Sequence, residues 1–72
     1  MTPDQAESLV MVHRYLYYVL SDSILNDAVY DQIEREARAI CPPESPVHGV
    51  GSSLPSSYTP EHKKKALELL SN

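Results

Sequence analysis

A proline- and serine-rich segment in the middle of the chain restricts the possible folds more than any other feature. Residues 42–60 hold five prolines, five serines and both glycines of the 72-residue sequence. Proline cannot continue a helix, so this segment separates the helices on its two sides. A connection of this length is uncommon inside a compact domain, and we expect it to be functional or mobile. Val47, Val50 and Leu54 are the apolar side chains that could hold it against the helices.

Three helices are predicted around this segment. Thr2 and Gln5 form a capping box with Pro3 at the first helical position, Asn26 is a cap for a second helix, and Thr59 begins a third. In chain order the predicted elements are a helix over residues 2–20, a helix over 26–41, a Pro/Ser-rich loop over 42–59 and a short C-terminal helix over 59–71. We therefore predict one small all-α domain over residues 1–72, with its first two helices packed antiparallel.

Apolar side chains recur at helical spacing in the first two helices. The stripe on the first helix consists of Leu9, Val10, His13, Leu16, Tyr17 and Leu20. Val12, Tyr15 and Val19 lie off this stripe, so the second half of the helix is apolar nearly all round. A three-helix domain this small cannot bury so much, and we expect part of it to face a ligand or a partner. The predicted inner face of the second helix consists of Val29, Ile33, Ala37 and Ile40.

Charge and cysteine content exclude several classes of protein. The net charge of -4 lies in residues 1–40, where three arginines stand against seven acids, and residues 41–72 are neutral. Direct binding of DNA or RNA needs a basic footprint and is not expected. The single Cys41 excludes an internal disulfide and favours a cytoplasmic setting. No apolar run is long enough to span a membrane. We expect the protein to be a monomer.

No catalytic site and no metal site are predicted. His13, His48 and His62 lack ligand spacing, and the sequence holds no recognisable nucleophile or phosphate-binding motif. We therefore expect a binding protein and not an enzyme.

The turn between the first two helices holds the candidate binding residues. Offsets of three and four place Asp27, Tyr30 and Asp31 on one face of the second helix. Tyr17 and Tyr18 end the first helix about 100° apart, so we expect one in the core and the other beside the acids. Carboxylates and phenols around a short turn form an acidic, aromatic concavity suited to a small cationic ligand that carries hydroxyl groups.

Structural roles could also explain these residues. An acid in the first turn, such as Asp27, stabilises a helix through its dipole. Asp31 could pair with Arg35 one turn later, and buried tyrosines often serve only as core.

Three separated blocks of the sequence resemble the N-terminal Ia domain of bacterial NAD+-dependent DNA ligases. The blocks are Tyr17-Tyr18, then Asp27-Ala28-Val29-Tyr30-Asp31, then Ser45-Pro46-Val47-His48-Gly49-Val50-Gly51. Their order and spacing match that family over residues 9–51. The chain departs from it at Ser21, Ser23 and Gly49, where the family has an acid, a proline and an arginine. No Lys-x-Asp-Gly adenylation motif occurs in this sequence.

The resemblance implies a ligand and the residues that would bind it. In that family the Ia domain binds the nicotinamide mononucleotide (NMN) half of NAD+. The corresponding positions here are Tyr17, Tyr18, Asp27, Tyr30 and Asp31. A cationic nicotinamide ring would stack on tyrosine faces, and carboxylates would hold the ribose hydroxyls.

Two functions follow as hypotheses. The first is a non-catalytic, free-standing regulator of bacteriophage type, built on a ligase Ia-like scaffold and acting in a bacterial host cell. It would need no cofactor and would dock onto a bacterial nucleic-acid enzyme, such as RNA polymerase (and so regulate transcription) or a DNA ligase subunit. Its predicted contact residues are Tyr18, Val19, Asp22, Asp27, Asp31 and Glu34. The second is a module that binds NMN or NAD+ weakly and acts with a separate adenylation domain of an NAD+-dependent DNA ligase.

Overall fold

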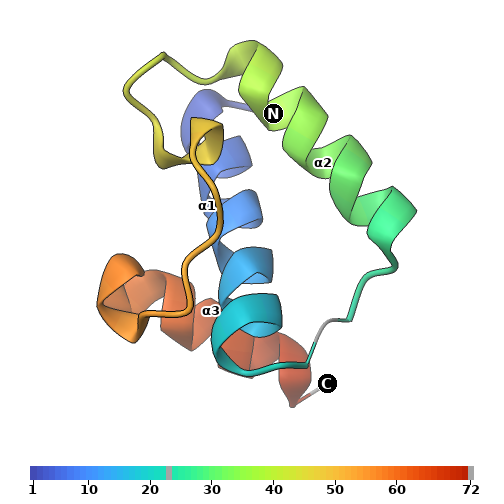
Figure 1. Ribbon diagram of the computed structural model, residues 1–72, viewed down its shortest axis with the longest axis vertical. Helices are drawn as coiled ribbons and strands as arrows, with labels where there is room; N and C mark the ends of the chain where they lie inside the picture. The colour runs from blue at the N-terminus through green and yellow to red at the C-terminus, as the bar shows by residue number, and fades with distance from the viewer. Residues whose placement is uncertain (23, 72) are drawn as a thin grey trace.

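Three α-helices and short connecting turns make up the fold. The computed structural model describes residues 1–22 and 24–71, and no strand occurs among them. In Figure 1 the helices are α1 (Pro3–Arg14, blue), α2 (Asp27–Ile40, green) and α3 (Pro60–Leu70, orange to red). Helix α2 runs back alongside α1, and α3 crosses the far end of α1. The predicted small all-α domain of three helices is confirmed.

The three helices begin at the caps that the sequence predicts. The hydroxyl of Thr2 accepts the amide proton of Gln5, whose side chain accepts that of Thr2 in return. Asn26 caps α2 through its side-chain oxygen. Thr59 caps α3 with His62 as its reciprocal partner, in place of the usual glutamate or glutamine.

A π-helical turn, η1 (Tyr15–Val19), extends α1 by a little over one turn. Its hydrogen bonds reach one residue further than those of an α-helix, as in the bond from the Leu20 amide to the Tyr15 carbonyl. The chain then leaves through Ser21, which adopts a left-handed conformation with φ of 53°. The Asp22 amide donates to the Leu16 carbonyl and closes this end.

Helix α1 is the central element, with apolar clusters on two of its sides. The first cluster joins α1 and η1 to α3 and consists of Met11, Val12, Tyr15, Leu16, Tyr58 and Ala66. The second joins α1 to α2 and the loop, and consists of Ala6, Val10, Ala37, Cys41 and Val47. Val12 and Tyr15 are buried, because α3 and the segment before it cover that side of the helix. Tyr17 and Tyr18 are exposed, so part of the apolar second half of the helix is left uncovered, as expected.

The inner face of α2 is rotated from the predicted one. Val29 and Ile40 are exposed, although the sequence pattern assigned them to the core. Ala37 is buried and Ile33 is partly buried, as predicted. Tyr30 and Glu34 occupy the rest of the inward side because they bond to a buried arginine on α1.

The Pro/Ser-rich segment is ordered around two short 3₁₀ turns, η2 (Pro46–His48) and η3 (Pro55–Ser57). Val47 is fully buried and holds the segment on α1, whereas Val50 and Leu54 are exposed, contrary to prediction. Tyr58 holds the second half of the segment in place: its hydroxyl donates to the Ser52 carbonyl at 2.6 Å, and its ring packs edge-on against Tyr15.

None of the helices among the described residues is long and apolar enough to cross a membrane.

Candidate functional site

A pocket of about 340 Å³ opens where the end of α1 faces the start of α2. Its lining consists of His13, Tyr17, Tyr18, Leu25, Asp27, Tyr30 and Asp31. The five residues that the resemblance implies therefore surround one opening, although they come from two elements separated by a turn. Their role in binding stays a prediction.

The two adjacent tyrosines both line the pocket. Tyr17 is 55% exposed and Tyr18 is 42% exposed, so neither is the core residue that a regular helix would require. Their rings meet edge to face, with centroids 4.8 Å apart and planes at 80°. A π turn spreads each hydrogen-bonded ring over one more residue, so successive side chains turn by less than in an α-helix. Both rings can therefore face the same opening.

The acidic side of the pocket is the first turn of α2. Asp27 is the first residue of the helix, Asp31 follows one turn later, and both are exposed. Two carboxylates on one rim give the opening a negative potential, which favours a positively charged group of a ligand at that rim.

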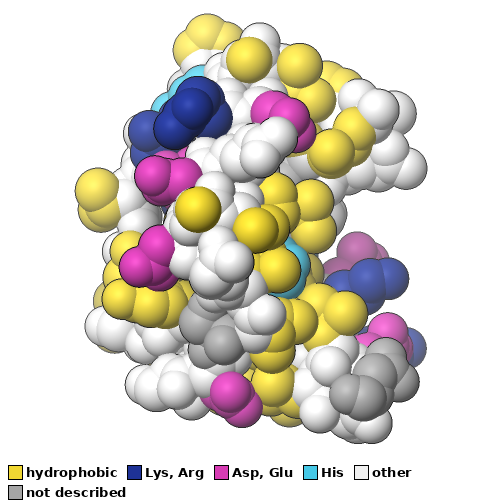
Figure 2. Space-filling view, turned by 90° about the vertical axis from the view of Figure 1, so that its right-hand side faces the viewer, with side chains coloured by type: hydrophobic (Ala, Val, Ile, Leu, Met, Phe, Trp, Pro, Cys, Tyr) yellow, Lys and Arg dark blue, Asp and Glu magenta, His cyan; other side chains and the backbone are white. Residues whose placement is uncertain are grey.

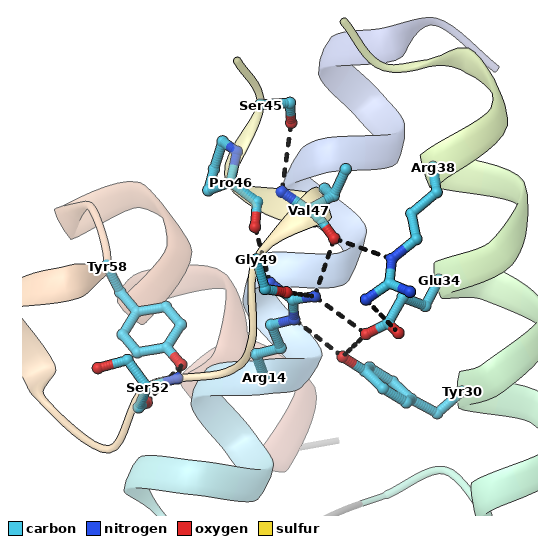
Figure 3. A network of polar contacts seen from close by, with 10 residues as sticks. All are labelled: Arg14, Tyr30, Glu34, Arg38, Ser45, Pro46, Val47, Gly49, Ser52 and Tyr58. Atoms are coloured by element: carbon cyan, nitrogen blue, oxygen red, sulfur yellow. Dashed lines mark hydrogen bonds and ion pairs between the residues drawn. The ribbon is translucent and has the colours of Figure 1, made fainter. Parts of the chain in front are cut away.

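A buried arginine lies behind the pocket, and no sequence pattern indicated that it would be buried. Arg14 is 2% exposed and points from α1 toward α2 and the loop (Figure 3). Its Nε donates to the Tyr30 hydroxyl at 3.0 Å, and its Nη2 forms an ion pair with Glu34 at 3.0 Å. Tyr30 in turn donates to Glu34 at 2.8 Å. The pocket residue Tyr30 is thus fixed by bonds to groups outside the pocket.

The same guanidinium holds the loop. Nη1 of Arg14 donates to the Pro46 carbonyl, and Nη2 donates to the carbonyls of Val47 and Gly49, at 2.9–3.0 Å. Gly49 is the loop position at which the resemblance implies an arginine. A guanidinium from α1 therefore bonds to the backbone at a loop position that lacks one of its own.

Charges around Glu34 keep it ionised. Burial alone would raise its pKa, but hydrogen bonds from Arg14 and Tyr30 and the charges of Arg14 and Arg38 outweigh burial and lower the pKa. Burial raises the pKa of Tyr30 to about 12, so the phenol stays a neutral donor. Glu34 was predicted as a partner-facing acid; the structure places it in this network, where its side chain is 19% exposed.

His13 is a pocket residue that the sequence pattern assigned only to the apolar stripe. It is buried, and burial lowers its pKa, so the neutral imidazole faces the pocket. The same side chain also borders a second, mainly apolar groove of about 610 Å³ between α1, residues 24–25 and α3. The space-filling view shows hydrophobic side chains running along this side of the molecule beside a hollow (Figure 2).

The described residues contain no group of three or more His, Cys, Asp or Glu side chains that could hold a metal ion. Of the other predicted contact residues, Asp22 is exposed and Val19 packs partly against the first apolar cluster. Ser23, a predicted departure from the ligase pattern, lies outside the described residues.

Comparison with known proteins connects the chain to DNA ligases. It is 39% identical to a DNA ligase of Psychrobacter cryohalolentis over 54 aligned residues, which are 65% of this chain and 8% of the ligase. A DNA ligase of Porphyromonas gingivalis is 30% identical over 96% of the chain and 11% of the ligase. A DNA ligase of Roseiflexus is 38% identical over 60% of the chain and 7% of the ligase.

The chain spans about a tenth or less of the length of these curated relatives. No protein-family model matches it, and no solved structure gives a significant match. The ligase matches agree with the family resemblance that the three sequence blocks indicate. The chain is therefore homologous to a short segment of DNA ligases.

Proposed function

We propose that this chain is a nucleotide-binding module that takes the NMN half of NAD+ in the pocket between α1 and α2. The observation that carries the proposal is the convergence of Tyr17, Tyr18, Asp27, Tyr30 and Asp31 on one opening. These are the positions at which the ligase resemblance implies contact with NMN.

The chemistry of the pocket fits this ligand. A positively charged nicotinamide ring is attracted to the faces of exposed tyrosines. The carboxylates of Asp27 and Asp31 can accept hydrogen bonds from ribose hydroxyls and favour the positive ring. A volume of about 340 Å³ is at the lower end of ligand pockets, so it suits one ring and its sugar and not a whole dinucleotide.

We assign no covalent step to the chain. The adenylate half of NAD+ and the adenylation reaction would belong to a separate domain of an NAD+-dependent DNA ligase. Binding of NMN alone should therefore be weak, with a dissociation constant of about 1 mM.

Nuclear magnetic resonance titration with NMN tests the proposal. The resonances of the five pocket residues should move first, and Asp31→Asn should weaken binding by roughly threefold to tenfold because a charge-assisted hydrogen bond is lost. Glu36→Gln is the matched control, since it removes an exposed acid of α2 outside the pocket. Pocket resonances that stay unmoved at saturating NMN, in a folded protein, would refute the proposal.

Docking onto a bacterial RNA polymerase or DNA ligase subunit is a second candidate function. It is favoured by exposed acids beside exposed apolar side chains: Asp22 and Asp27 lie close in sequence to Ile24 and Val29, all on the surface. Acids of this kind would meet a basic patch and raise the association rate, and the apolar side chains would supply affinity.

Binding to purified RNA polymerase or ligase, measured at increasing salt, tests this candidate. Charge reversal at Asp27 should weaken binding more than charge reversal at Lys64, which is exposed on α3. Equal effects of the two variants, or binding that does not depend on salt, would count against it.

A further inference from the structure

Gly51 lies directly against the ring of Tyr18. A Cβ atom built on Gly51 would overlap the Cδ2 and Cε2 atoms of that ring. Neither Gly49 nor Gly51 adopts a positive φ, so the backbone does not need glycine at these positions. Glycine is therefore needed at position 51 because it has no side chain, which leaves room for the Tyr18 ring.

The loop that carries Gly51 is held firmly by a buried side chain of α1. Three of its carbonyls accept hydrogen bonds from the buried Arg14, as Figure 3 shows. Val47 is fully buried, and Ser45 donates to Glu7 at 2.7 Å. The Tyr18 ring is 42% exposed and sits at the end of a flexible side chain. If a side chain were added at position 51, the Tyr18 ring would therefore move and the loop would not.

Movement of the Tyr18 ring changes the pocket. Tyr18 lines the opening, and its ring meets that of Tyr17 edge to face. A side chain at position 51 would displace the Tyr18 ring and so change its packing against Tyr17. Two aromatic walls of the pocket therefore depend on the empty space above Gly51.

We propose that Gly51 is a positioning residue for ligand binding: the loop held by Arg14 sets the orientation of the Tyr18 ring through it. The predicted effect on affinity rests on the proposed function, because there the Tyr18 ring would stack on the flat, cationic ring of the ligand. The contact between Gly51 and Tyr18 can be tested without any ligand.

Gly51→Ala and Gly49→Ala form a matched pair of variants. At Gly49 an added Cβ meets only the Pro46 carbonyl oxygen at 3.5 Å, an ordinary contact. Gly51→Ala should shift the aromatic resonances of Tyr18 and Tyr17 and leave the melting temperature nearly unchanged, whereas Gly49→Ala should shift neither ring. Tyrosine rings that keep their wild-type resonances in Gly51→Ala would overturn the inference.

Titration with NMN then measures the consequence for binding. Gly51→Ala should weaken binding by roughly threefold to tenfold, the range expected when one aromatic contact is lost, and Gly49→Ala should not. In a Tyr18→Ala background the Gly51→Ala change should have no further effect. An equal loss in both backgrounds would show that Gly51 does not act through Tyr18 and would overturn the inference. Failure of the unmodified protein to bind NMN would refute the proposed function, while the ring resonances would still decide the role of Gly51.

Discussion

At the scale of single residues, the burial of Arg14 has the largest consequences. Removing a guanidinium from water is expensive, and the cost is offset only when its donors are well paired. Arg14 donates to three carbonyls, one phenol and one carboxylate, so it joins α1 to α2 and to the loop. The carboxylate of Glu34 is its only acidic partner among the described residues.

Loss of the charge on Glu34 should therefore destabilise the domain. Glu34→Gln keeps the shape of the side chain but leaves the buried Arg14 without a counter-charge, and we expect a loss of about 1–3 kcal/mol in the free energy of unfolding. The control is Arg38→Gln, because Arg38 is half-exposed and its pair with Glu34 should contribute about 1 kcal/mol or less. Urea denaturation of both variants measures the difference. Equal losses would contradict a special role for Arg14.

At the scale of elements, the π turn η1 determines how the site is presented. It places two adjacent tyrosines at one opening, and it ends through Ser21 in a left-handed conformation that residues with a Cβ rarely adopt. Local strain of this kind is often found beside functional sites.

Replacing Ser21 by glycine should relieve that strain. Because glycine adopts a positive φ without a steric penalty, Ser21→Gly should raise the free energy of unfolding by up to about 1 kcal/mol. Ser53→Gly is the control, since it changes the same residue type in the loop at a position without a positive φ, and it should not stabilise. Thermal unfolding compares the two. A destabilised Ser21→Gly variant would show that the left-handed conformation is not costly here.

The elements that could be predicted from the sequence are those with local causes. Caps at Thr2, Asn26 and Thr59 and the prolines after position 41 act on their own neighbours, so the helix limits follow from short stretches. The direction in which each side chain points could not be predicted in the same way. The π turn leaves no periodic signal, and three acceptors of Arg14 are loop carbonyls more than thirty positions away.

The pocket was predictable in its composition but not in its construction. The motif resemblance supplied Tyr17, Tyr18 and the three residues of α2, all of which line the pocket. His13 was missed because a histidine on an apolar stripe looks like core. Gly51 belonged to a motif, but its effect depends on a ring 33 positions earlier in the chain.

At the scale of the whole molecule, acid should destabilise the domain in two steps. Burial lowers the pKa of His13 and of His62, the latter against the opposing charges of Glu7 and Glu61. A lowered pKa in the folded state means that stability is fully present above the ordinary value of 6.5 and falls as pH drops below it. The lowered pKa of Glu34 adds a second loss below its ordinary value of 4.5.

Thermal unfolding across this pH range, from neutral to acidic, checks both steps. Glu34→Gln should reduce the loss below pH 4.5 and leave the loss that begins near 6.5 in place. A melting temperature that is constant between these two values would contradict the buried, neutral state of the histidines.

The two apolar clusters share α1 but no side chain, and this has a consequence for how the domain opens. A fluctuation that lifts α3 breaks the cluster around Leu16 and leaves that around Val10, with the Arg14 bonds, intact. In such a sub-global opening, α3 unfolds as a cooperative unit that is smaller than the whole domain. Amide protons of α3 should then exchange with solvent together and sooner than those of α2. Helix α3 would open on its own, while the acidic side of the pocket keeps its shape.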